Sequence, residues 1–138
     1  MPDLKHILET ARTIAVVGCS ENPARTSYAI ARYLQTAGYR VIPVNPNIDA
    51  CLGETAYPDL QSIPDDITVD IVNIFRHPQH TADMVRMTID YAEKTGTEPA
   101  IWTQLGVSSL EAEALAEGAG LPYVANRCIM VMHRSLIE

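Results

Sequence analysis

The residues best suited to chemistry lie in a loop that follows a short hydrophobic segment near the N-terminus. The segment Ile14–Val17 ends at Gly18, and the loop after it carries Arg25 and Ser27 before an amphipathic helix begins. Glycine has no Cβ, so the backbone there can approach a ligand closely. The N-terminus of the following helix offers unpaired N–H groups and a positive dipole end to an anion. This arrangement predicts a phosphate-binding loop and a nucleotide-type cofactor.

Hydrophobic patterning predicts the elements that position this loop. Helices are expected over residues 4–11, 26–37, 79–94 and 109–116, and a turn or helix near the C-terminus reaches Leu136. Strands are expected over 14–17, 39–44, 69–75, 100–105 and 123–125, and a short one over 54–57. Asp3, Thr26 or Ser27, and Ser108 or Ser109 are the expected helix caps.

Strands and helices alternate along the chain, and the connections between them are short. Most consecutive strands are therefore expected to be parallel neighbours. With right-handed crossovers, this predicts an α/β fold: a Rossmann-like, doubly wound three-layer sandwich with a mainly parallel five-stranded sheet. One domain is expected over residues 1–138. Ligands of such sheets lie at the carboxyl ends of the strands. That rule selects four loops, at residues 18–27, 45–47, 76–78 and 104–107.

Composition narrows the range of partners. The net charge is −7 and only Lys5 and Lys94 are lysines, so neither nucleic acid nor an anionic membrane is an expected partner. No apolar run approaches the roughly 20 residues that span a bilayer. The first residues lack the features of a signal peptide, and a cytoplasmic location is expected. Arg25, Arg76 and Arg127 follow expected strands, and the first two are candidates for phosphate, whereas Arg127 is expected to be structural.

A dinucleotide is the first alternative for the cofactor. Its usual fingerprint has three glycines in the first loop and an acidic residue at the end of the second strand. Here the loop has only Gly18, and the second strand ends in Val44-Asn45-Pro46. A hydride-transfer enzyme would also need a substrate domain, for which no chain remains. An NAD-type ligand therefore stays only as an alternative.

Cysteine and histidine residues give weaker signals. Cys19, Cys51 and Cys128 are odd in number and form no C-x-x-C pair, which is typical of reduced thiols rather than of a zinc site. Cys19 lies near a helix dipole that would lower a thiol pKa, although a small residue filling a tight turn is the simpler interpretation. His77 and His80 are expected to open a helix rather than bind metal. No nucleophile with a base and an orienting partner can be assembled, so no catalytic residue is predicted.

Several motifs together resemble the small stand-alone CoA-binding proteins, a family similar in fold to the CoA-binding domain of the succinyl-CoA synthetase α subunit. The resemblance covers nearly the whole chain. It begins at Ala15-Val16-Val17-Gly18-x-Ser20-x-x-Pro23-x-Arg25-x-Ser27-Tyr28 and continues through Val41-Ile42-Pro43-Val44-Asn45-Pro46 and Gly53-x-x-x-Tyr57-Pro58-x-Leu60. Its later motifs are Val69-Asp70-Ile71-Val72, Phe75-Arg76-x-Pro78, Trp102-x-Gln104-Leu105-Gly106 and Asn126-Arg127-Cys128-Ile129.

The resemblance implies a coenzyme A site in the selected loops. Gly18, Cys19 and Ser20 would pass close to the nucleotide end, and Arg25 and Ser27 would meet phosphate. Asn45, Pro46 and Asn47 would border the adenosine, Phe75, Arg76 and Pro78 would form the opposite wall, and Gln104 to Gly106 the far rim. Relatives often carry a basic residue where this chain has Asn47, so a charge contact from that loop to the 3′-phosphate is not expected.

The implied function is binding of coenzyme A or an acyl-CoA, without catalysis of its own. Two alternatives stay open. One is a detached CoA-binding subunit that works with a synthetase partner chain, and the other is a redox protein that joins Cys19 to the CoA thiol. A homodimer through apolar residues in 48–60 is a further partner that the sequence leaves open.

Overall fold

The structure, a computed structural model, describes residues 2–137. Its main sheet contains five strands, β1 (Thr13–Val17), β2 (Arg40–Val44), β5 (Ile71–Ile74), β6 (Ala100–Thr103) and β7 (Tyr123–Val124). The helices are α1 (Leu4–Thr10), α2 (Thr26–Thr36), α3 (Pro78–Thr95), α4 (Leu110–Gly118) and α5 (Ile129–Leu136). A hairpin of β3 (Ala50–Cys51) and β4 (Glu54–Thr55) and a 3₁₀ turn (Leu60–Ser62) complete the elements.

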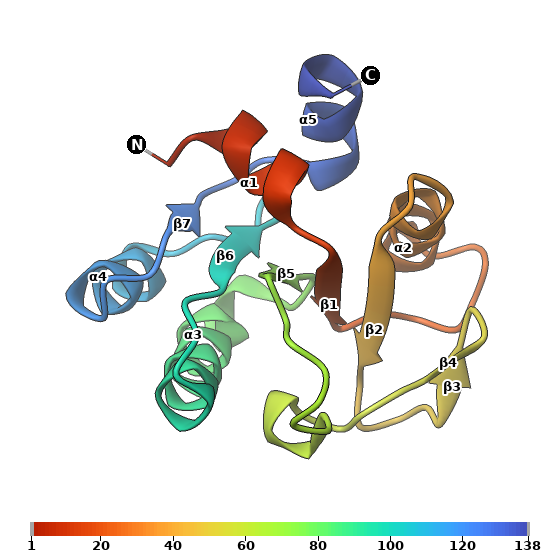
Figure 1. The fold of residues 1–138 in the computed structure, drawn as a ribbon, viewed down its shortest axis with the longest axis horizontal. Helices are drawn as coiled ribbons and strands as arrows, with labels where there is room; N and C mark the ends of the chain where they lie inside the picture. Colours follow the sequence, from red (N-terminus) through yellow and green to blue (C-terminus); the bar gives the residue numbers. More distant parts are fainter. Residues whose placement is uncertain (1, 138) are drawn as a thin grey trace.

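The sheet has the strand order β2-β1-β5-β6-β7, and every neighbouring pair in it is parallel. The predicted α/β class and five-stranded Rossmann-like sheet are therefore confirmed. The chain moves outward from β1 to β2, then returns to the other side of β1 and moves outward through β5, β6 and β7 (Figure 1). The carboxyl ends of β1 and β5 thus flank the point where the strand order reverses, which is where such sheets bind ligands.

Helices cover both faces of the sheet because successive strand residues point to opposite sides. Val17, Ile74 and Ile101 pack in the core shared with α3 and α4. Val16, Ile71 and Trp102 pack in the core shared with α1, α2 and α5. Figure 1 shows these two helix groups on opposite sides of the strands. Strands buried on both faces explain why their sequences read as unbroken hydrophobic runs.

The connection from β2 to β5 departs from the strict alternation of strands and helices that the sequence predicts. It contains no α-helix within the described residues, only the hairpin and the 3₁₀ turn. The expected strand over 54–57 is realised as β4, and its partner β3 was not predicted. Leu52 (φ 54°) and Gly53 (φ 78°) make the turn between them. Leu60 is fully buried in the α3 core, so this segment covers that face of the sheet in place of a helix.

The first residues of α2 also differ from the prediction. Its N-cap is Arg25, whose side chain makes no capping bond, rather than Thr26 or Ser27. Asp3 and Ser109 cap α1 and α4 as expected, by accepting hydrogen bonds from His6 N and Ala112 N. One predicted cap is therefore missing, at the helix that follows the candidate phosphate loop. Within residues 2–137, no helix combines the length and apolar character needed to cross a membrane.

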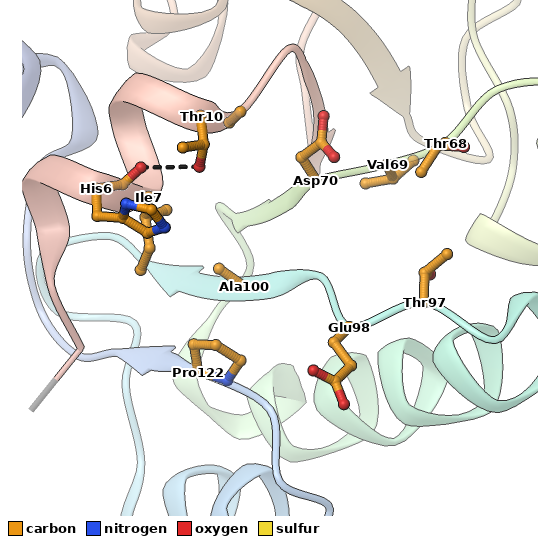
Figure 2. Close-up of a pocket in the computed structure, with 11 residues that line it drawn as sticks. His6, Ile7, Thr10, Thr68, Val69, Asp70, Thr97, Glu98, Ala100 and Pro122 are labelled. Atoms are coloured by element: carbon orange, nitrogen blue, oxygen red, sulfur yellow. Dashed lines mark hydrogen bonds between the residues drawn. The ribbon is translucent and has the colours of Figure 1, made fainter.

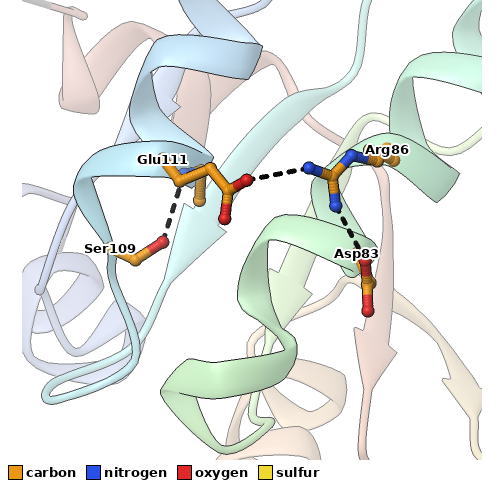
Figure 3. A network of polar contacts seen from close by, with 5 residues as sticks. Asp83, Arg86, Ser109 and Glu111 are labelled. Atoms are coloured by element: carbon orange, nitrogen blue, oxygen red, sulfur yellow. Dashed lines mark hydrogen bonds and ion pairs between the residues drawn. The ribbon is translucent and has the colours of Figure 1, made fainter.

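Two sets of polar contacts join elements of the fold, one at the edge of the sheet and one on the surface. Asp70, just before β5, accepts hydrogen bonds from Arg12 N (2.9 Å) and Thr13 N (3.0 Å) and so sets the start of β1 beside β5. On the surface, Arg86 of α3 bonds Asp83 at 2.8 Å and Glu111 of α4 at 2.9 Å (Figure 3). The Arg86 pairs are exposed and screened by water, so they contribute little to stability.

Replacing Asp70 should destabilise the protein because two backbone N–H groups lose their acceptor. We expect Asp70→Ala to lower the free energy of unfolding by about 1–3 kcal/mol, measured by chemical denaturation. The matched control is Asp66→Ala, an exposed carboxylate before the same strand, which should change stability by less than about 0.5 kcal/mol. Equal effects of the two substitutions would contradict the assigned role of Asp70.

Candidate functional site

A hollow of about 550 Å³ lies at the reversal point of the sheet. Its lining comes from the end of β1, the loop and first turn of α2, and the end of β5. The residues are Gly18, Ser20, Ala24, Arg25, Thr26, Ser27 and Phe75. Five of these residues, all except Ala24 and Thr26, are among those the sequence assigns to the site. Two segments far apart in the chain therefore meet here: residues 18–27 supply six of the lining residues, and the end of β5 supplies Phe75.

The first turn of α2 opens into this hollow with unpaired donors. The first N–H groups of a helix have no partner within it. Among the described residues, nothing accepts a hydrogen bond from the N–H groups of Thr26, Ser27 or Tyr28. The other helices differ: α1, α3 and α4 have side-chain caps from Asp3, His77 and Ser109, and the first N–H group of α5 donates to a glutamine side chain. Donors left free at a helix N-terminus favour an anion.

Internal hydrogen bonds hold the loop before α2 in shape. Ser20 N donates to Ser27 Oγ at 3.0 Å, which joins the start of the loop to the helix. Asn22 N donates to Ser20 Oγ, also at 3.0 Å. Asn45, at the end of β2, donates through Nδ2 to Cys19 O at 2.9 Å and accepts from Asn47 N at 2.9 Å. The loops at residues 18–27 and 45–47 are therefore tied together, and the site needs little rearrangement to bind a ligand.

Gly18 is required by the close packing of two loops. Its φ is +87°, a backbone conformation that residues other than glycine rarely adopt. A Cβ placed on Gly18 would lie 2.8 Å from Phe75 O and 3.2 Å from Cδ of Arg76. The loop after β5 thus crosses directly against Gly18, and Arg76 extends over it.

Arg25 and Arg76 provide the positive charge of this region. Arg25 is exposed and Arg76 is half-buried. In the described part of the chain, neither forms an ion pair, including with Glu21 or Asp49, the partners considered from sequence. Each guanidinium is therefore free to bind an anion, and an arginine–phosphate hydrogen bond is among the stronger polar contacts.

The remaining predicted residues take other positions. Pro46 and Asn47 are exposed beside Asn45, and Pro78 is exposed as the first residue of α3. Gly106 lies beyond β6 and lines a different hollow. Gln104 is only 5% exposed, and its Oε1 accepts hydrogen bonds from Asn73 Nδ2 (3.1 Å) and Ile129 N (2.9 Å). Its side chain therefore supports the start of α5, a role that sequence patterning does not reveal because the partners are distant in the chain.

Cys19 follows Gly18 in the chain but does not line the hollow, and its side chain is buried in the core. It is fully buried, and desolvation together with the neighbouring Cys51 thiol raises the pKa of Cys19 to about 12. The expectation that a helix dipole would lower this pKa is wrong, because burial outweighs the dipole. The thiol hydrogen bonds to Ser20 O at 3.9 Å, as does Cys51 at 3.6 Å. The simpler interpretation, a small residue filling a tight turn, agrees with this placement.

His77 takes a structural position at the start of α3. His77 is the N-cap of α3 and accepts a hydrogen bond from Gln79 N at 3.3 Å, as expected for a residue that opens the helix. Within residues 2–137, no group of three or more metal-ligating side chains is clustered.

A second hollow lies at the opposite, amino edge of the sheet (Figure 2). It measures about 210 Å³, and Asp70 and Glu98 line it together with His6 and Thr10. Among the described residues, no lysine or arginine lines this hollow. Carboxylates without a cation repel an anionic ligand, so of these two hollows only the one at the carboxyl edge suits phosphate.

Substituting Gly18 tests the close packing of the two loops. Gly53 has a similar positive φ (+78°) but nothing lies within 4 Å of its added Cβ. Gly53→Ala should therefore cost about 1–2 kcal/mol of stability from backbone strain alone. We expect Gly18→Ala to cost about 1–3 kcal/mol more, because of the contact with Phe75 O. Chemical denaturation of both variants measures the difference, and equal losses would contradict the close approach.

Burial of the Cys19 thiol predicts low reactivity. With a pKa of about 12, about one part in ten thousand of the thiol is ionised at pH 8, and only the thiolate reacts. In the folded protein treated with iodoacetamide at pH 8, we expect Cys128, which is partly exposed, to be alkylated well before Cys19. Peptide mass spectrometry measures both, with urea-unfolded protein as control. Equal rates in the folded protein would contradict the inward placement of Cys19.

Comparison with known proteins identifies the family and the fold. A family model described as a CoA binding domain matches residues 12–134. The uncharacterized protein YneT of Bacillus subtilis is 37% identical over 131 residues, which are 95% of this chain and 92% of YneT. A solved structure of a hypothetical protein from Pyrococcus horikoshii has 36% identity and a TM-score of 0.89, covering 99% of this chain and 91% of that one.

A more distant relative is larger. The ADP-forming acetate–CoA ligase II of Archaeoglobus fulgidus is 30% identical over 76 residues, which are 54% of this chain but only 11% of the ligase. The resemblance drawn from the sequence motifs is therefore confirmed at the level of the family. The chain belongs to the CoA-binding domain family.

Proposed function

We propose that this protein binds coenzyme A or an acyl-CoA at the carboxyl edge of its sheet and has no catalytic activity of its own. The observation that carries the proposal is the uncapped N-terminus of α2, which has three free N–H groups and whose residues Thr26 and Ser27 line a hollow of about 550 Å³. Membership in the CoA-binding domain family supplies the identity of the ligand.

The phosphates of CoA would bind at the first turn of α2. Backbone N–H groups of Thr26, Ser27 and Tyr28 would donate to the pyrophosphate, and Arg25 would add a charged contact. Each hydrogen bond to a charged group contributes about 1.5–3 kcal/mol. The Ser27 hydroxyl accepts from Ser20 N and keeps its own hydrogen for a phosphate oxygen.

The other loops would enclose the rest of the nucleotide. Asn45, Pro46 and Asn47 would border the adenosine, since Asn45 is hydrogen-bonded to the loop of Gly18–Ser20. Phe75 and Arg76 would form the opposite wall, because both pack against Gly18. Cys19 would contribute its backbone only, and this favours simple binding over a disulfide with the CoA thiol.

A second candidate function follows from the distant ligase relative. A stretch of 76 residues, 54% of the chain, matches a small part of an ADP-forming acetate–CoA ligase, so the chain could act as a detached CoA-binding subunit of a synthetase. Copurification with a nucleotide-binding partner chain, together with CoA-dependent ATP turnover of the mixture, would distinguish this function from binding alone.

Calorimetric titration tests the proposed ligand and the role of Arg25 together. We expect the protein to bind CoA, to bind dephospho-CoA almost equally because Asn47 carries no charge, and to bind NAD more weakly. Arg25→Ala should weaken CoA binding ten-fold or more, about 1.4 kcal/mol.

The control for this titration is Arg32→Ala, which removes an exposed arginine two turns further along α2. It should leave the affinity for CoA within about two-fold. If the wild-type protein binds none of CoA, dephospho-CoA and NAD, the proposed function is refuted. An unchanged affinity in Arg25→Ala would refute the role of that residue alone.

A further inference from the structure

Another hollow, separate from the proposed phosphate site and from the hollow at the amino edge, lies beyond the carboxyl end of β6. It measures about 400 Å³ and is lined by Gly106, Ser108, Ser109, Leu110, Glu113, Ala125 and Asn126. A smaller hollow of about 200 Å³ lies along β7. It is lined by the apolar or aromatic residues Pro2, Leu4, Tyr123, Val124 and Ala125 and by the charged residues Glu113 and Arg127. Glu113 and Ala125 line both hollows, so the two are neighbours, and we call them together the trough.

The mouth of the trough is held in a defined shape. Asn126 has a positive φ of 59°, unusual for a residue other than glycine. Its Oδ1 accepts a hydrogen bond from Gly106 N at 2.7 Å, and its N–H donates to Thr103 Oγ1 at 3.1 Å. These bonds keep the loops after β6 and β7 together at the carboxyl edge.

Apolar side chains are exposed on this side of the molecule. Leu105, in the segment that joins β6 to α4, is 66% exposed, and Leu110, the first residue of α4, is 87% exposed. Val131, on α5, is the third large apolar residue exposed in the described part of the chain. Of the three, only Leu110 lines the trough. Exposed apolar groups beside a hollow are favourable contacts for an apolar ligand group.

Distance connects the trough to the phosphate site. The ends of β1 and β7 are three strand spacings apart in the sheet, which is roughly 14 Å at the usual spacing. The pantetheine arm of CoA has about the bond count of four residues of backbone, which extend to about 14 Å. An arm that starts at the N-terminus of α2 can therefore cross β5 and β6 and bring its sulfur to the mouth of the trough.

We propose that the trough between the β6–α4 segment and β7 binds the acyl group of an acyl-CoA of medium chain length. This inference rests on the proposed function, because only a ligand anchored at α2 directs its thioester to this place. Leu110 would contact the acyl chain in the first hollow, and Leu4, Tyr123 and Val124 would contact its end along β7. Glu113 lies at the junction, where a carboxylate opposes an apolar chain.

Calorimetry with CoA and octanoyl-CoA tests the trough. We expect octanoyl-CoA to bind wild-type protein about ten-fold more tightly than CoA. Leu110→Asn should reduce that preference to about three-fold or less and leave CoA binding unchanged. Val131→Asn is the matched control, an exposed apolar side chain outside the trough, and should keep the full preference.

A variant with the opposite expected sign separates this inference from damage to the fold. Glu113→Gln removes the charge at the junction and should strengthen octanoyl-CoA binding several-fold without affecting CoA. Equal affinity of wild-type protein for CoA and octanoyl-CoA would overturn the acyl trough while the proposed function stands. Binding of neither ligand would overturn both. A dimer in sedimentation that Leu110→Asn abolishes, without an acyl preference, would assign the trough to a second copy of the chain and also overturn the inference.

Discussion

Three backbone N–H groups at the start of α2 lack a partner within the described chain, and the site is organised around them. They face a hollow that exists because β1 and β5 end side by side where the strand order reverses. Gly18 lets the loop after β5 lie against the loop after β1. Ser27 and Asn45 tie the remaining segments to that loop. An anion bound there would accept the hydrogen bonds that no side chain of the described chain accepts.

An acidic protein can hold a polyanion because its charges are unevenly placed. The chain carries a net charge of −7, and the hollow at the amino edge contains Asp70 and Glu98 without an arginine or lysine in its described lining. At the carboxyl edge, Arg25 and Arg76 have no carboxylate partner in the described residues. Local charge, rather than net charge, therefore decides which edge of the sheet suits phosphate.

Most of the fold could be predicted from the sequence because its signals are local. Hydrophobic runs mark strands buried on both faces, and Asp3 and Ser109 mark helix starts. Strand β3, the partner of β4, was missed because the hairpin depends on Leu52 adopting a left-handed conformation that its side chain does not favour. Ser27 was misjudged as a cap, since its hydroxyl serves Ser20 N instead.

Within the site, the limits of prediction have the same origin. Gly18, Arg25 and Arg76 could be assigned to one region because they follow strands of a parallel sheet, whereas Phe75 was assigned through the family resemblance. The inward turn of Cys19 and the burial of Gln104 could not, because both depend on contacts with Cys51, Asn73 and Ile129, which are distant in sequence. Side-chain direction at a loop is set by such contacts, and periodicity carries no information about it.

A crystal structure of the protein soaked with CoA tests the central claim most directly. The account predicts pyrophosphate oxygens within hydrogen-bond distance of the backbone nitrogens of Thr26, Ser27 and Tyr28, with the Arg25 guanidinium beside them. Density for CoA at another surface, or a first turn of α2 occupied by the protein's own side chains in the soaked crystal, would contradict it.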